Sequence, residues 1–216
     1  VCVMPRERID IAIKLASNKD VIFCTLGDLL RIPGSKISLL ELRAKGADVR
    51  ALYSPLDVLK IASENTDKKV IFFALGFETT TPMTALLLEK VIEKEIKNVF
   101  FHINHITVPA AIHSIMQDEN VKIDAFLGPS HVSVITGYKI YEDIAKKYKT
   151  PIAVSGFEPV DIMQSVLNIV LQMNESKFEV FNQYKRAVSE FGNTKAQALV
   201  NKYFKPCDFE FRGLGL

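Results

Sequence analysis

Three glycine-led polar motifs contain the side chains of this sequence that are best suited to chemistry. They are GFETTTP at 76–82, GPSHVS at 128–133 and GFEPVD at 156–161. Each combines hydroxyl, carboxylate or imidazole groups with the free backbone N–H groups of an expected helix start, where anions bind readily. Because Gly-Phe-Glu opens two of the motifs, we hypothesise that Glu78 and Glu158 occupy comparable positions on two α/β halves that face one cleft.

Histidines offer a second kind of chemistry. His131 lies within the second motif, and an imidazole in a cleft can donate, accept or bind a metal near neutral pH. We expect a functional role for it, with a structural role at a helix start as the alternative. His102 and His105 form an HxxH pair, which is a weak metal signal because no third ligand accompanies it.

Each of the three motifs follows an apolar segment that reads as a buried strand, at 70–75, 123–127 and 151–155. Thr81 is the expected N-cap of the helix after the first of these strands, and Pro82 suits its first turn. The carboxyl ends of parallel strands lie at one edge of a sheet, so we expect the three motifs to converge on one pocket. Further strands are expected at 21–26, 48–53 and 98–103. Helices are expected at 5–17, 38–46, 55–64, 82–96 and 108–117, followed by a helical region that ends at 148 and a long helix that runs through 169.

The six alternations of strand and helix predict the fold class α/β, with Rossmann-like parallel sheets, flanking helices and a helix-rich C-terminal part. After residue 178 the pattern is helical and amphipathic. We expect residues 1–150 to form a Rossmann-like α/β domain. Residues 151–216 would supply a strand and helices to a second α/β domain, completed by residues that precede this sequence.

Composition narrows the functional classes. The 216 residues carry a formal net charge of +2, which gives no sign of a nucleic-acid or membrane surface. No signal peptide and no bilayer-spanning apolar run is visible. Cys2, Cys24 and Cys207 are odd in number and widely spaced, which favours free thiols in a reducing cytoplasm. The absence of GxxxxGK[ST], GxSxG, HExxH and GxGxxG motifs disfavours the commonest nucleotide, acyl-transfer and zinc-protease chemistries.

Several ordered segments resemble the HypD family of [NiFe]-hydrogenase maturation factors, from the first residue to the last. They are VCVMPRERID, IFCTLGDLLRIPGS, GADVRALYSPLDVLKIA, GFETTTP, IDAFLGPSHVSVITG, SGFEPVDI and RGLG. The chain begins with Val and ends with FRGLGL, so we expect a piece of a longer protein. It would lack the N-terminal segment and the C-terminal iron-sulfur part of the family.

The resemblance implies a maturation scaffold with a redox role rather than a conventional turnover enzyme. In the family, HypD pairs with the chaperone HypC, holds the iron of the Fe(CN)2CO unit and receives cyanide ligands from HypE. A [4Fe-4S] cluster is thought to pass electrons through a nearby dithiol. The resemblance also implies two Rossmann-like domains around a cleft, and we expect neither cluster nor complete iron site within these 216 residues.

The family's functional residues carry over onto the three motifs. Cys2 matches the second cysteine of a Cys-Pro-Val-Cys pair whose partner is not in this sequence, so it is the expected redox thiol and a possible metal ligand. Cys24 is expected to be a core thiol, and Cys207 matches no known cluster ligand. The residues that match the motifs lining the cleft are Gly76, Phe77, Glu78, Thr79, Thr80, Gly128, Pro129, Ser130, His131, Val132, Ser133, Gly156, Phe157, Glu158, Pro159 and Asp161.

Two other functions stay open on the sequence. The motifs could cradle a phosphate or carboxylate in a Rossmann-type enzyme or binding module for a small anionic ligand. Alternatively, they could bind a protein partner in a pure interaction module.

Overall fold

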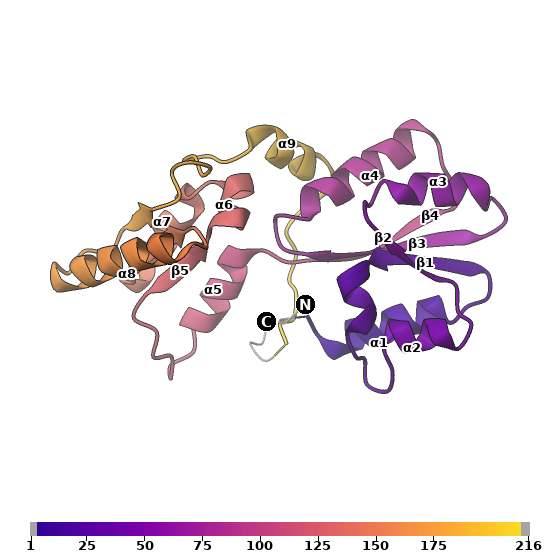
Figure 1. Cartoon of the computed structure of the whole chain (residues 1–216), viewed down its shortest axis with the longest axis horizontal. Coiled ribbons are helices and arrows are strands. Elements are labelled where there is room, and N and C mark those ends of the chain that lie inside the picture. Colours follow the sequence, from indigo (N-terminus) through magenta and orange to yellow (C-terminus); the bar gives the residue numbers. More distant parts are fainter. Residues whose placement is uncertain (1–3, 213–216) are drawn as a thin grey trace. The chain divides into compact units, whose positions relative to one another are not determined.

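The computed structural model describes residues 4–212, which form two compact units. The first contains residues 4–76, 80–106 and 202–212, and the second contains residues 77–79 and 107–201. Each unit is a parallel sheet flanked by helices (Figure 1), which confirms the predicted α/β class. Among residues 4–212 no helix is long and apolar enough to cross a membrane.

The first unit has a four-stranded sheet with the strand order β2-β1-β3-β4. All three pairings are parallel, and the central β3 contributes to two of them. The strands are β1 (Val21–Leu26), β2 (Val49–Leu52), β3 (Lys69–Gly76) and β4 (Val99–His105).

Helices cover both faces of this sheet (Figure 1): α1 (Arg6–Ala16) and α2 (Leu39–Ala44) lie on one face, and α3 (Asp57–Glu64) and α4 (Thr81–Glu93) on the other. Successive side chains of a strand point to opposite faces. Phe73 of β3 therefore packs in the first core with Ile9 of α1, and Phe72 in the second core with Leu87 of α4. Burial on both faces explains why the strand is a continuous apolar run.

The second unit has a three-stranded sheet, β5 (Phe126–Pro129), β6 (Ile152–Ser155) and β7 (Val180–Asn182), in that order and all parallel. Ile152 and Val154 pack with α5 (Val108–Met116) and α7 (Glu142–Tyr148). The long helix α8 (Pro159–Asn174) packs against β6 as well. The unit also contains α6 (Ser130–Thr136), the 3-10 turn η2 (Lys139–Tyr141) and most of α9 (Thr194–Tyr203).

Several local predictions were wrong in detail. The segment after residue 178 begins with β7, which was predicted as helix, because a three-residue strand is too short to show an alternating pattern. β5 ends at Pro129 rather than 127, so Gly128 and Pro129 belong to the strand itself. Thr80, not Thr81, is the N-cap of α4.

The largest difference concerns which strands pair. The sequence predicted three motifs at one sheet edge, but the first motif follows β3 of the four-stranded sheet, and the other two follow β5 and β6 of the three-stranded sheet. The compact units also divide near residue 106, which differs from the predicted division at 150, because β5 pairs with β6. Hydrophobic periodicity identifies a strand but not its neighbour.

Candidate functional site

The second and third motifs lie side by side at the carboxyl edge of the three-stranded sheet. The pairing of Pro129 with Ser155 brings the ends of β5 and β6 together. Two residues further along each chain segment, His131 and Phe157 are both exposed, and their ring centroids are 5.4 Å apart. Parallel pairing thus joins these two motifs into one exposed surface.

Two of the three motif glycines are required by their surroundings. Gly76 has φ +139°, a conformation that L side chains rarely adopt, and an added Cβ would overlap the Thr80 side chain. A Cβ on Gly156 would overlap the Asp161 carboxylate and the Tyr184 ring. Gly128 is different, because a Cβ there would meet its nearest neighbours at an ordinary 3.5 Å.

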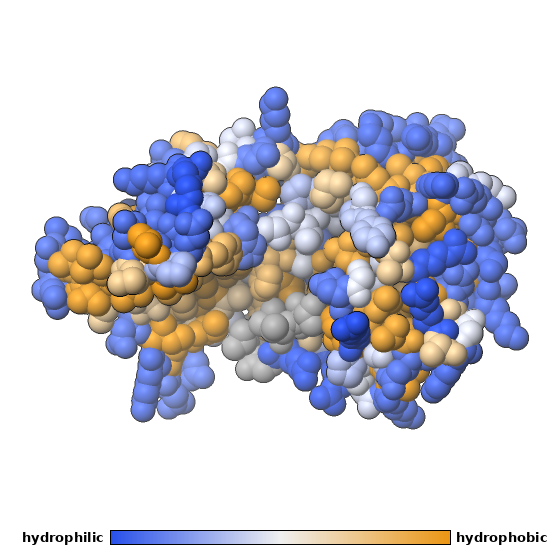
Figure 2. All heavy atoms as spheres, viewed as in Figure 1, coloured by the Kyte–Doolittle hydropathy of each residue, from blue (hydrophilic) through white to orange (hydrophobic). Residues whose placement is uncertain are grey.

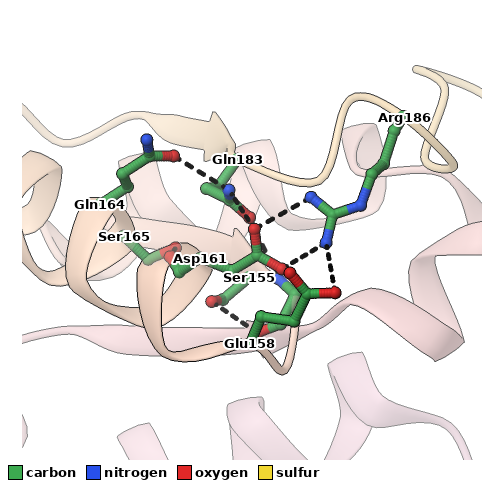
Figure 3. A network of polar contacts seen from close by, with 8 residues as sticks. Ser155, Glu158, Asp161, Gln164, Ser165, Gln183 and Arg186 are labelled. Atoms are coloured by element: carbon green, nitrogen blue, oxygen red, sulfur yellow. Dashed lines mark hydrogen bonds and ion pairs between the residues drawn. The ribbon is translucent and has the colours of Figure 1, made fainter.

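A polar network holds the third motif in place (Figure 3). The buried Asp161 carboxylate accepts hydrogen bonds from both terminal nitrogens of Arg186 and, at 2.8 Å, from Gln183 Nε2. Gln183 Oε1 in turn accepts from the Gly156 backbone N–H at 3.2 Å. The hydrogen bond from Arg186 is the main reason why the pKa of Asp161 is lowered to about 2. Asp161 therefore fixes this turn, whereas Glu158 is exposed and pairs with Arg186 over 3.9 Å.

Gln183 and Arg186 are functional-site residues that the sequence did not predict. Both follow β7, where the sequence pattern predicts a helix, and neither belongs to a recognisable motif. Arg186 is further positioned by Tyr184, with its guanidinium carbon 4.1 Å from the ring centroid. A correct prediction of β7 would have placed this segment beside the third motif.

In the first motif, residues 77–79 connect β3 to α4 and group with the second unit. Thr79 is the last residue of this connection. The hydroxyl of the following residue, Thr80, donates a hydrogen bond to the Leu75 carbonyl at 3.3 Å. Glu78 Oε1 accepts a hydrogen bond from the backbone N–H of Val108, the first residue of α5, at 2.9 Å. Glu78 Oε2 is buried and has no hydrogen-bond partner among the described residues. Burial raises the pKa of Glu78, although the backbone N–H donors act in the opposite direction.

Three more buried oxygens of the second unit lack partners within residues 4–212: Ser130 Oγ, Tyr141 Oη and Asn182 Oδ1. Burial, with a smaller contribution from the charge of Glu78, raises the pKa of Tyr141 to about 12. Ser133 lies close enough to Tyr141 to oppose that shift, but its hydroxyl donates to the Pro129 carbonyl at 2.9 Å. Buried polar atoms without partners are rare, so these oxygens are candidates for contact with a small polar group or water.

The N-termini of α5 and α8 already hold carboxyl groups of the chain itself. Glu78 accepts a hydrogen bond from the backbone N–H of Val108 at the start of α5, and Asp161 accepts one from the backbone N–H of Glu158 at the start of α8. A carboxylate at a helix N-terminus uses the same donors and positive potential that a bound anion would need. This arrangement argues against a phosphate or carboxylate cradle at these two positions.

The HxxH histidines have structural contacts within the first unit. Burial lowers the pKa of His105 to about 4, and its Nε2 lies 2.8 Å from Thr84 Oγ1. The His102 ring stacks on Phe73 with centroids 5.2 Å apart. No group of three possible metal ligands occurs in the part of the chain that the structure describes.

The cysteines of residues 4–212 do not fit an iron-sulfur cluster. Cys24 is buried in β1, and burial raises its pKa to about 12, so the thiolate that binds iron is disfavoured. This confirms Cys24 as a core thiol. Cys207 is exposed, and Cys2, the predicted redox thiol, lies outside the described residues.

Comparison with known proteins covers the entire chain. The family model described as "Hydrogenase formation hypA family" (HypD) matches residues 1–216. The chain is 46% identical to the hydrogenase maturation factor HypD of Rhodobacter capsulatus over all of its own length and 57% of that relative. It is 48% identical to the HypD of Azotobacter vinelandii, of which it covers 59%, and 45% identical to the HypD of Escherichia coli K12, of which it covers 58%. The chain thus spans less than three fifths of the length of these relatives, and it belongs to the HypD family.

Proposed function

We propose that this chain is part of a hydrogenase maturation factor. The observation that carries the proposal is the family match over all 216 residues, with 45–48% identity to proteins named as HypD maturation factors. The motifs that carry the resemblance are also the ones that the fold presents at the carboxyl ends of β3, β5 and β6.

In its finer form the proposal assigns a scaffold and redox role in the cytoplasm. With a HypC-like chaperone, the full-length protein would hold the iron of the Fe(CN)2CO unit as cargo and accept cyanide ligands from a HypE-like donor. A [4Fe-4S] cluster in another part of the protein, with Cys2 as one thiol of a dithiol pair, would supply electrons.

The chemistry of the motif residues supports a site for iron that carries cyanide. Cyanide nitrogens accept hydrogen bonds, and neutral donors around them orient the group without adding charge. Ser130 and Tyr141 have buried hydroxyls without partners among the described residues, and both hydroxyls are neutral donors. The alternative of a small-anion enzyme is less favoured, because Glu78 and Asp161 already occupy the N-termini of α5 and α8.

The test uses the full-length protein in a strain whose own HypD gene is deleted. We expect the wild type to restore hydrogenase activity, to co-purify with a HypC-like protein and to show C≡N stretching bands in the infrared spectrum of that complex. Cys2→Ala should still co-purify with HypC but should lack the bands, which separates scaffold binding from thiol chemistry.

A surface variant, Lys146→Ala, is the matched control and should behave as the wild type. The proposal would be wrong if the wild type neither binds HypC nor restores activity while a nucleotide or small acid raises its thermal midpoint by several degrees.

A further inference from the structure

Helix α8 buries polar residues and exposes apolar ones, which is the reverse of an ordinary surface helix. Its sheet-facing side consists of Asp161, Ser165, Ile169 and Gln172, spaced three or four residues apart, and three of these four residues are polar. Its other sides are mostly apolar and are open to solvent. Val160, Met163 and Leu167 are 63%, 71% and 60% exposed. The exposed apolar residues of the helix are Val160, Ile162, Met163, Val166, Leu167, Val170, Leu171 and Met173.

Hydrogen bonds fix this orientation. The Asp161 carboxylate accepts hydrogen bonds from Arg186 and Gln183, which lie outside the helix. Gln172 Oε1 accepts from the Glu179 backbone N–H at 2.9 Å. Rotation of α8 to bury Met163 and Leu167 would break this set of bonds, so the apolar side belongs on the outside of this unit.

The uncovered surface extends from the helix to the sheet. Phe126 of β5 packs with the core on the α5 and α7 side, so the next residue, Leu127, points to the opposite face. Leu127 is 50% exposed, although its neighbour in register, Ala153, is fully buried. Figure 2 shows hydrophobic side chains gathered where Figure 1 places α8. Parallel sheets are normally covered by helices on both faces, and here the face that carries Leu127 has room for another element.

The composition of α8 indicates that another protein segment permanently covers its exposed apolar side. Asp161 is the only charged residue between Pro159 and Asn174, and it is buried and paired. Surfaces that alternate between free and bound states keep polar and charged residues at their rims, whereas the exposed side of α8 carries eight apolar residues and no charged one. A transient partner therefore does not suit this face.

We propose that the apolar side of α8 and Leu127 is an internal interface, covered by the part of the same polypeptide that these 216 residues do not include. About two fifths of the length of the HypD relatives lies outside the matched part, which is ample for a helix beside α8. The segment that docks here is apolar, and it completes the second layer of helices on the three-stranded sheet. This inference rests on family membership and not on the proposed role in maturation.

Methionine oxidation of the full-length protein tests the proposal without any substitution. Dilute hydrogen peroxide oxidises accessible methionines, and peptide mass spectrometry gives the rate at each one. We expect Met163 and Met173 to react as slowly as Met4, which is fully buried in the first unit. In denaturant all three should react at the same rate. Fast oxidation of Met163 in the folded full-length protein would overturn the proposal, because it would leave the face to a separate partner or to solvent.

A dilution series tests whether a second copy of the chain, and not another part of the same polypeptide, covers this face. The rates are measured at two concentrations a hundredfold apart, with the oligomeric state determined by native mass spectrometry. Protection that disappears together with a dimer would overturn the proposal, and protection in a monomer at both concentrations supports it. As an independent check, Leu167→Gln should lower the thermal midpoint of the full-length protein by several degrees, whereas the exposed control Lys146→Gln should not.

Discussion

Glu78 and Glu158 are the same residue of the same Gly-Phe-Glu tripeptide, yet their environments are opposite. One oxygen of Glu78 is buried without a partner among the described residues, and the other caps α5. The side chain of Glu158 is 78% exposed. The sequence predicted equivalent positions after two strands, and each glutamate does follow a strand of its own sheet. The hypothesis that both face one cleft stays a prediction.

The raised pKa of Glu78 has a measurable consequence. A carboxyl group whose pKa is higher in the fold than in the unfolded chain stabilises the protein at low pH, and this stabilisation is lost as pH rises through the folded pKa. Glu78→Gln keeps an oxygen for the Val108 N–H and removes the titration. We therefore expect the variant to unfold at a higher temperature than the wild type at pH 7.5. The difference should vanish below pH 4.5, the ordinary pKa of a glutamate side chain.

Thermal unfolding curves of the 216-residue chain between pH 4 and pH 8 measure this difference. Glu158→Gln is the matched control and should change the midpoint little, because its ion pair is long and exposed. A lower midpoint for Glu78→Gln at every pH would show that the ionised carboxylate makes a contact on which the fold depends.

At the scale of elements, the turn from β6 into α8 is held by hydrogen bonds to residues that follow β7. Asp161 ties Gln183 and Arg186, which follow β7, to the start of α8. The close approach of Gly156 to the Asp161 carboxylate leaves no room for a side chain. The turn therefore depends on contacts between segments that are distant in the sequence, which is why the motif alone predicted its position but not its partners.

Gly156→Ala should destabilise the second unit by about 1–3 kcal/mol, the usual cost of forcing an extra carbon into a packed site. Chemical denaturation of the 216-residue chain measures the change. Gly27→Ala is the control, since a Cβ at Gly27 meets nothing within 4 Å, and it should be close to neutral. Equal stability of the two variants would mean that the turn relaxes around the methyl group, and that Asp161 is not held as tightly as its contacts indicate.

At the scale of the whole molecule, the sequence predicted the class of fold better than its connectivity. Apolar runs such as 70–75 identified the central strands, because parallel strands are buried on both faces. The same property gave no information about pairing, so β5 was assigned to the first domain, although it pairs with β6 in the second sheet. The three-residue strand β7 was not predicted for a different reason, since it is positioned by its pairing with β6 and is too short to show a pattern of its own. Without β7, neither Gln183 nor Arg186 could be connected to Asp161.

The cysteines lead to a prediction about metal content. Cys24 is buried with a strongly raised pKa, Cys207 is exposed, and residues 4–212 contain no group of three possible metal ligands. After anaerobic reconstitution, we expect the 216-residue chain to hold little iron and acid-labile sulfide, and the full-length protein to hold one [4Fe-4S] cluster per chain. In the full-length protein, Cys24→Ser and Cys207→Ser should leave iron and sulfide unchanged, because a cluster needs thiolates that these two residues do not bring together. A stoichiometric cluster in the 216-residue chain, or its loss in either serine variant, would place cluster ligands inside this chain and contradict the proposed division of roles.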